Sequence, residues 1–80
     1  MNRKWCLLKA SDGVRGEAGK KKVYEVTVSD NTLVCEWGMA ERPSRQRSTQ
    51  HFMYNQSAMA AAYEKVSSKI NRGYELVYSV

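Results

Sequence analysis

Two runs rich in β-branched and aromatic residues, at 23–28 and 33–37, stand only four residues apart and constrain the fold most strongly. Runs of this composition favour strands. The residues between them include Asp30 and Asn31. Because Asp and Asn tolerate the positive φ that a tight turn demands, the segment predicts a β-hairpin with these two residues at its tip.

The register of the hairpin follows from that turn. Tyr24 is expected to face Trp37 on one apolar face of the sheet, and Glu25 to face Glu36 on the other. Like charges placed directly opposite each other destabilise a β-ladder. We therefore expect a cation beside these two glutamates.

The rest of the chain supplies further strands and one helix. The segments are strands near 5–8, 45–53 and 74–80, a loop over 11–20, and an alanine-rich helix over 55–72 that ends before Gly73. Runs of strands with one helix indicate the α+β class. We expect a single domain, residues 1–80, with an antiparallel β-sheet of about four to five strands and one α-helix packed across one face.

Two periodicities predict which side chains face the core. Apolar residues on one stripe of the helix should cover the sheet, namely Met59, Ala62, Tyr63, Val66 and Ile70. In the strand near 45–53, Phe52 is the best anchor for the inward face. Counting back in twos from Phe52 places Arg45 and Arg47 on the outward face.

Composition narrows the classes of function. The chain has 80 residues, a formal net charge of +5 and a pI near 9.4, which favour anionic partners such as nucleic acid. Cys6, Cys35 and a single histidine do not supply a zinc site, and the two thiols are expected to be buried. The sequence shows neither a phosphate-binding glycine loop nor a nucleophile with a base, so we expect no enzyme and no cofactor. The short apolar run at 5–8 favours a cytoplasmic protein over a secreted or membrane-spanning one.

Several segments around Trp37-Gly38 share their order and spacing with one known family. They are Lys22-Val23-Tyr24-Glu25-Val26, Asp30-Asn31, Leu33-Val34-Cys35-Glu36-Trp37-Gly38, Phe52, the alanine-rich helix and Lys69-Ile70-Asn71-Arg72-Gly73-Tyr74. Together they resemble the WGR domain, a small module found in poly(ADP-ribose) polymerases and in bacterial proteins, some of them little more than this module. The resemblance covers about residues 5 to 78.

The resemblance implies a binding module without catalytic residues, which in the polymerases engages DNA near breaks. In those proteins the signature tryptophan packs against a sugar and the signature arginine contacts the backbone. Trp37 matches the tryptophan, whereas Met39 stands at the arginine position, so the arginine contact does not carry over. Lys69 approximately matches a lysine at the helix end that approaches DNA in some members.

We therefore predict nucleic-acid binding, with DNA as the expected form, around a basic loop that follows Trp37-Gly38. The predicted contacts are Trp37, Arg42, Arg45, Arg47 and Lys69. Guanidinium groups suit this task because they pair bidentately with phosphate oxygens. We expect no metal and no membrane contact.

Two alternatives stay open. Arg45 or Arg47 could instead neutralise Glu25 and Glu36, and Trp37 could be a core residue, since large aromatic side chains are mostly buried. The chain could also be a protein–protein interaction or dimerisation module, in which the outer face of the sheet or an edge strand docks a partner or a second copy. The missing signature arginine favours this second function.

Overall fold

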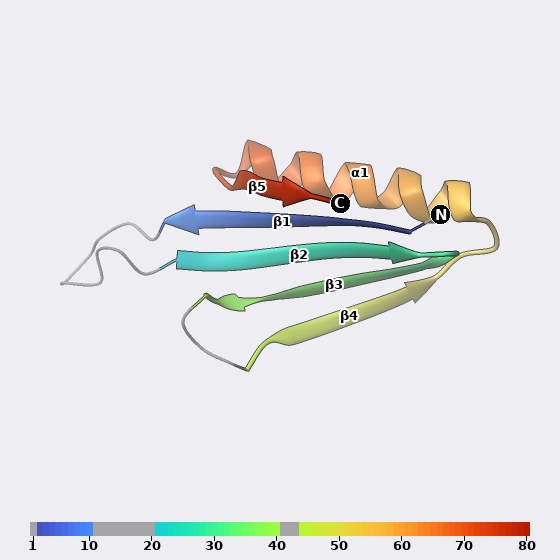
Figure 1. The fold of residues 1–80 in the computed structure, drawn as a ribbon, viewed down its shortest axis with the longest axis horizontal. Helices are drawn as coiled ribbons and strands as arrows, with labels where there is room; N and C mark the ends of the chain where they lie inside the picture. Colours follow the sequence, from blue (N-terminus) through green and yellow to red (C-terminus); the bar gives the residue numbers. More distant parts are fainter. Residues whose placement is uncertain (1, 11–20, 41–43) are drawn as a thin grey trace.

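The computed structural model describes residues 2–10, 21–40 and 44–80, apart from the side chain of Ala10. Its elements are β1 (Asn2–Ala10), β2 (Lys21–Ser29), β3 (Thr32–Met39), β4 (Gln46–His51), α1 (Asn55–Asn71) and β5 (Glu75–Ser79). The predicted 11–20 loop and Arg42 lie outside the described residues. Figure 1 shows the strands side by side, with α1 along one face of the sheet.

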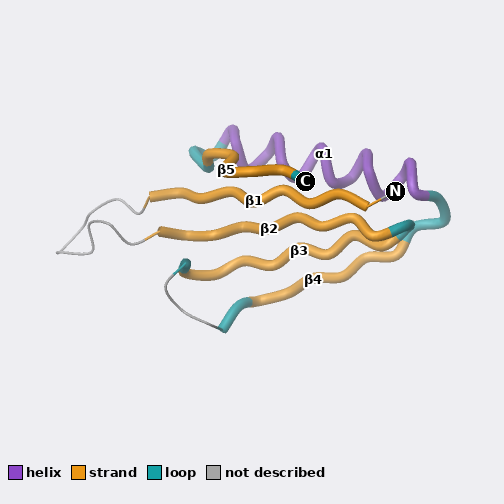
Figure 2. The backbone as a smooth tube through the Cα atoms, viewed as in Figure 1, coloured by secondary structure: helices purple, strands orange, loops and turns teal. Residues whose placement is uncertain are grey.

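The sheet has five strands in the order β4-β3-β2-β1-β5, and all neighbouring strands are antiparallel. The tube in Figure 2 follows this meander from β1 to β4 and then the return of the chain, through α1, to the free side of β1. The α+β fold with one helix across an antiparallel sheet is therefore confirmed. We call the sheet face covered by α1 the helix-side face and the opposite one the outer face.

The β2–β3 hairpin has the predicted register. Asp30 adopts a positive φ of 55° at the turn. Tyr24 pairs with Trp37 across the ladder, and Glu25 pairs with Glu36. A two-residue turn thus fixes which side chains of both strands share a face, because strand side chains alternate.

The strand β4 also has the predicted register, although it is shorter than the predicted segment. Arg47 pairs with Glu36, and Gln46 pairs with Trp37. Because side chains alternate along a strand, Arg47 lies on the outer face and Gln46 on the helix-side face. All six residues of β4 are exposed, so this strand is a polar edge of the sheet.

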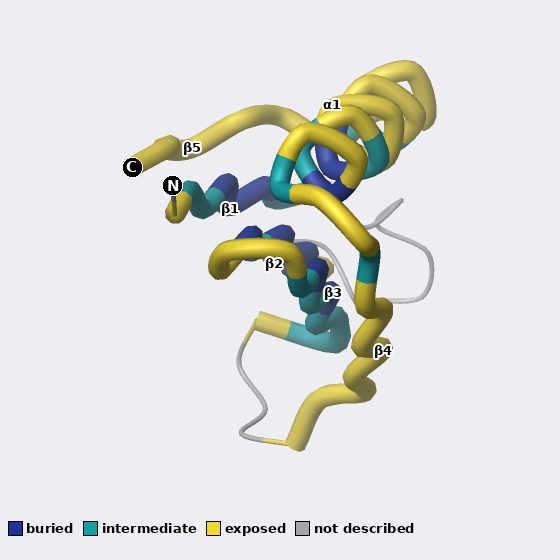
Figure 3. The backbone as a smooth tube through the Cα atoms, turned by 90° about the vertical axis from the view of Figure 1, so that its right-hand side faces the viewer, coloured by how far each residue is buried: buried dark blue, intermediate teal, exposed yellow. Residues whose placement is uncertain are grey.

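The core lies between α1 and the central strands. Its largest fully buried side chains are Leu7, Val26 and Val28. Figure 3 shows the burial concentrated in β1, β2, β3 and the sheet-facing side of α1, while β4 and β5 are exposed. Within the described residues, no helix combines the length and the apolar character needed to cross a bilayer.

The predicted helix stripe is wrong at two positions. The buried residues of α1 are Ala58, Ala62 and Val66, whereas Tyr63 and Ile70 remain 46% and 45% exposed. Alanine side chains let the helix backbone lie close to the sheet, so the larger side chains are displaced to the margin of the contact. Tyr63 still packs edge-on against Trp5 of β1, with ring centroids 5.3 Å apart. The helix ends as expected at Gly73, whose φ of 98° favours glycine.

Candidate nucleic-acid interface

The predicted contact residues divide between the two faces of the sheet. Trp37 lies on the helix-side face, because it pairs with Tyr24, whose ring packs in the core. Arg47 lies on the outer face with Glu36, and Arg45 reaches Glu25 on that same face. Lys69 belongs to the last turn of α1 and is therefore on the side of Trp37. Trp37 and Lys69 thus both contact Tyr24 on the helix-side face, whereas Arg45 and Arg47 pair with glutamates on the outer face.

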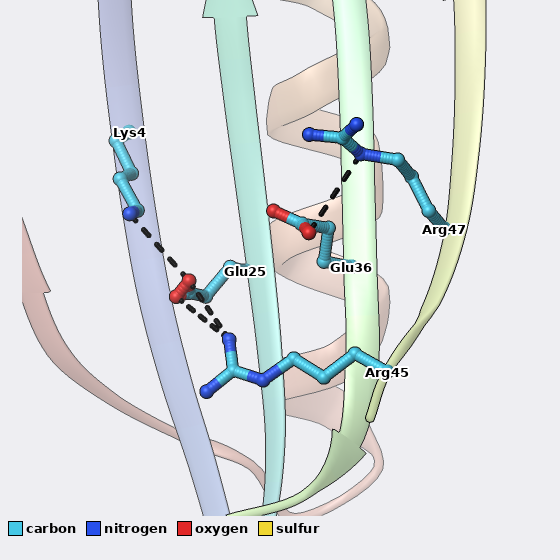
Figure 4. Close-up of polar contacts among 5 residues, drawn as sticks. All are labelled: Lys4, Glu25, Glu36, Arg45 and Arg47. Carbon is cyan, nitrogen blue, oxygen red and sulfur yellow. Dashed lines mark hydrogen bonds and ion pairs between the residues drawn. The ribbon is translucent and has the colours of Figure 1, made fainter. Parts of the chain in front are cut away.

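On the outer face, Arg45 is held by Glu25. Its Nη1 atom donates a hydrogen bond to Oε2 of Glu25 at 3.1 Å and lies 3.1 Å from Oε1. The Nζ atom of Lys4 is 3.5 Å from the same carboxylate, whose side chain is only 12% exposed. Figure 4 shows Glu25 between these two cations, with Arg45 extending across β3 to reach it. The cation expected beside this glutamate is therefore confirmed.

Arg47 is held more loosely. Its Nε atom lies 3.7 Å from Oε2 of Glu36, and its side chain is 65% exposed. Figure 4 shows the contact made through Nε, while the rest of the guanidinium group extends past the carboxylate. An exposed pair at this distance contributes little stability. Arg47 therefore neutralises Glu36 and keeps most of its surface open to solvent.

Gly38 makes room for the path of Arg45. A Cβ atom at Gly38 would lie 3.3 Å from the carbonyl oxygen of Ser44 and 3.4 Å from Cγ of Arg45. The first distance is shorter than ordinary van der Waals contact, and the second lies at its lower limit. The glycine after Trp37 thus allows the segment that enters β4 to lie against β3. It also allows the side chain of Arg45 to cross to β2.

On the helix-side face, aromatic rings form a stack. Trp37 is half-buried and lies parallel to Tyr24, with centroids 5.7 Å apart and an angle of 14° between the planes. Tyr74 packs edge-on against Tyr24 at 6.2 Å. Trp37 therefore packs against the core and remains partly exposed, and its contact with nucleic acid stays a prediction.

Lys69 lies over this stack. Its Nζ atom is 4.5 Å from the centroid of Tyr24 and 6.0 Å from that of Tyr74, distances typical of cation–π contact. Burial lowers the pKa of Lys69 from its ordinary value, and the positive charges of Arg72 and Lys65 lower it further. Lys69 is thus a partly desolvated ammonium group in a positive environment.

An open pocket lies at this corner of the sheet, at the end of β3. It is bordered by Trp37 and Met39 from the helix-side face and by Gly38 and Arg45 from the outer face. A ligand seated at the end of β3 can therefore touch both the indole ring and the segment that enters β4.

A family model for the WGR domain matches residues 5–79, nearly the whole chain. The chain belongs to the WGR domain family. Neither a curated protein nor a solved structure matches it. The family is of the nucleic-acid-binding type, so the match agrees with the coarse function predicted from the sequence.

In this WGR domain, Met39 occupies the last signature position, at the end of β3. Its partner across the ladder is Lys22 of β2. The thioether of methionine carries no charge with which to bind phosphate. Lys22 is therefore the charged residue that pairs with Met39 across the β2–β3 ladder.

Sequence reasoning missed a pair of lysines on the helix-side face. Lys9 and Lys22 lie directly opposite each other in the β1–β2 ladder. Lys22 stands two residues before Tyr24 and shares its face, and Nζ of Lys9 lies 5.8 Å from the centroid of Tyr74. We call Lys9, Lys22 and Lys69 the lysine cluster. No carboxylate of the described residues forms an ion pair with any of the three.

The lysine cluster could be found only from the β1–β2 register, which the sequence leaves open because the two strands are far apart in the chain. Like charges opposite each other weaken a ladder unless an anion lies between them. Among the described residues, no group of three or more His, Cys, Asp or Glu side chains could hold a metal ion.

Proposed function

We propose that this WGR domain is a non-catalytic module that binds the backbone of nucleic acid, with DNA as its expected ligand. The observation that carries the proposal is the position of Lys69. Its ammonium group lies over the ring of Tyr24, which stacks on Trp37, and has no carboxylate partner in the described residues, while Arg45 and Arg47 are paired with glutamates.

The lysine cluster and the rings suit a sugar–phosphate chain. The half-buried indole of Trp37 offers an apolar surface for a sugar, as the family resemblance implies, and Lys69, which lies over the neighbouring ring of Tyr24, would meet a phosphate of the same chain. A phosphate near Lys9 and Lys22 would relieve the repulsion between them. Backbone contacts of this kind position a protein on nucleic acid but carry no sequence information. We therefore expect binding with little sequence preference.

The predicted arginines take different roles in this proposal. Arg47, whose side chain is 65% exposed, serves as an additional phosphate contact. Arg45 is committed to Glu25 and holds the segment entering β4 in place. Arg42 lies outside the described residues and remains a predicted contact.

The experiment is a fluorescence-anisotropy titration of short labelled DNA at a series of salt concentrations. Blunt, nicked and single-stranded probes of the same length distinguish ends, breaks and unpaired strands. If each lysine of the cluster neutralises one phosphate, the logarithm of the affinity falls against the logarithm of salt concentration with a slope of about −2.7 on duplex DNA. An affinity that does not change with salt would refute the proposal.

A matched pair of variants tests whether DNA binds to the helix-side face. Lys22→Gln should reduce the slope by about one contact. Lys21→Gln removes the same charge from the neighbouring residue, whose side chain points to the outer face, and should leave the slope unchanged. Equal effects of the two substitutions would show that only the net charge matters.

A further inference from the structure

The open pocket at the end of β3 offers a ring, a thioether and an amide in place of a free cation. It has a volume of about 260 Å³, and its described lining residues are Trp37, Gly38, Met39, Ser44, Arg45 and Gln46. Arg45 is the charged residue among them, and its guanidinium group is paired with Glu25 on the outer face. The chemistry of this lining therefore suits an uncharged planar group better than a phosphate.

One face of the Trp37 indole is turned toward this pocket. Trp37 pairs with Tyr24 of β2 and with Gln46 of β4, so its side chain stands between these two on the helix-side face. The ring of Tyr24 stacks on one face of the indole, with an angle of 14° between the planes. The opposite face is therefore turned toward β4. On that side lie the exposed side chain of Gln46 and the pocket.

The walls of the pocket match the surfaces of a nucleobase. A planar base stacks on an aromatic side chain, and a thioether also packs favourably against an aromatic ring. The amide of Gln46 both donates and accepts hydrogen bonds, so it can meet the polar edge of a base. Met39, which stands at the position of the signature arginine, thus gives the pocket an apolar wall instead of a charge.

We infer that this pocket binds one unpaired base of a nucleic-acid strand, which stacks on the free face of Trp37 and hydrogen-bonds to Gln46. The inference rests on the proposed function and deepens it, because it assigns the ligand to strands that carry an unpaired nucleotide. A base inside a duplex cannot enter, since the neighbouring base pairs cover both of its faces. Stacking accepts every base, which agrees with the small sequence preference expected above.

The lysine cluster stands next to this pocket. Lys22 pairs across the β2–β3 ladder with Met39, and the two side chains share the helix-side face. A nucleotide whose base stacks on Trp37 therefore has a cation nearby for its phosphate. Because the sugar is attached to the base, the sugar contact implied by the family resemblance and the base contact belong to the same nucleotide.

The first experiment compares three DNA probes of equal duplex length by anisotropy titration. One is blunt, one has a single unpaired nucleotide, and one has the same overhang without its base. The abasic overhang keeps the sugar and the phosphate, so it isolates the contribution of the base. With overhangs at the 3′ and the 5′ end tested separately, at least one polarity should bind at least about tenfold tighter with its base than without it.

The outcomes separate this inference from the proposed function. Equal affinities for the complete and the abasic overhang, at both ends, would overturn the inference. Salt-dependent binding of the blunt and abasic probes would then leave the proposed function intact. If none of the probes binds, both fail.

A matched pair of variants tests the amide contact. Gln46→Ala should reduce the ratio between the affinities for the complete and the abasic overhang by about threefold, the effect of one lost hydrogen bond. Gln50→Ala removes the same side chain from the same face of β4, four residues further along, and should leave this ratio unchanged. Both residues are exposed, so neither substitution disturbs the core. Equal effects of the two substitutions would contradict a contact with Gln46.

A spectroscopic experiment tests the stacking itself. The fluorescence of 2-aminopurine, placed as the unpaired base, should fall when the protein binds, because stacking on an indole quenches it. Trp37→Leu keeps an apolar side chain but cannot stack, so it should abolish the quenching and bring the ratio between complete and abasic overhangs close to one. Circular dichroism verifies that this variant is folded. Unchanged 2-aminopurine fluorescence on binding to the wild-type protein would contradict the stacking on Trp37.

Discussion

The two faces of the sheet carry similar numbers of cations but use them differently. On the outer face, Arg45 and Lys4 hold the nearly buried carboxylate of Glu25, and Arg47 pairs with Glu36. On the helix-side face, Lys69 and Lys9 lie against aromatic rings and have no carboxylate partner among the described residues. A count of positive charges does not separate these two situations. The hairpin register does, because it places both glutamates on one face and both stacked rings on the other.

The largest expected effect comes from removing two lysines of the helix-side face. Lys22→Gln combined with Lys69→Gln should weaken DNA binding by about 100-fold at low salt, taking about 1.5 kcal/mol for each charge-assisted contact. Anisotropy titration measures the change.

The control for this double variant is Lys65→Gln combined with Lys21→Gln, which lowers the net charge equally. Lys65 and Lys21 are exposed, and among the described contacts neither ammonium group lies over a ring of the stack. The control should lose far less affinity. A similar loss for both would mean that the two faces do not differ in binding.

The second largest expected effect is a loss of folding stability when a cation of the outer face is removed. Arg45→Met leaves Glu25 with Lys4 alone and should lower the free energy of unfolding by about 1.5 kcal/mol, the typical contribution of a hydrogen bond between charged groups. Urea denaturation measures this loss. DNA affinity should change by less than about threefold, since Arg45 is not a principal phosphate contact in the proposal.

A second substitution sharpens the interpretation of that result. In the Arg45→Met background, Glu25→Gln removes the unpaired charge and should recover part of the lost stability. An Arg45→Met variant that keeps its stability but loses most of its DNA affinity would reverse the roles assigned to the two faces.

The smallest expected effect is a pH dependence of binding. The pKa of Lys69 lies below the ordinary value of 10.5, mainly because of burial. The charged form binds phosphate, so affinity should be complete at neutral pH and fall as pH rises through the lowered pKa. We expect a loss of about fivefold before the ordinary lysine range is reached. Lys69→Arg keeps its charge over this range and should abolish the dependence, as measured by anisotropy titration at increasing pH. The same pH profile for both proteins would contradict this role of Lys69.

Much of the fold could be predicted from short-range signals in the sequence. The Asp30-Asn31 turn determined the β2–β3 register, and Phe52 determined the register of β4. The helix stripe was predicted less well, because the alanines bring α1 close to the sheet and displace Tyr63 and Ile70 to the margin. Side-chain size, as well as spacing, decides which residues a helix buries.

The candidate site was predicted only in part. Trp37 and Lys69 were identified from the family resemblance, and the structure brings them together through Tyr24. The pairing of Arg45 with Glu25 was one of two open alternatives, since the repulsion between glutamates requires a cation but does not specify which one. Lys9 and Lys22 were not identified, because the long connection between β1 and β2 gives no register.

The most direct test of the central claim is an amide chemical-shift titration of the protein with short duplex DNA. The lysine cluster and the ring stack should respond first, so the earliest shifts are expected at Lys22, Trp37, Lys69 and Tyr74. Shifts that begin at Arg47 and the outer face, or the absence of any shift, would contradict binding through the helix-side face.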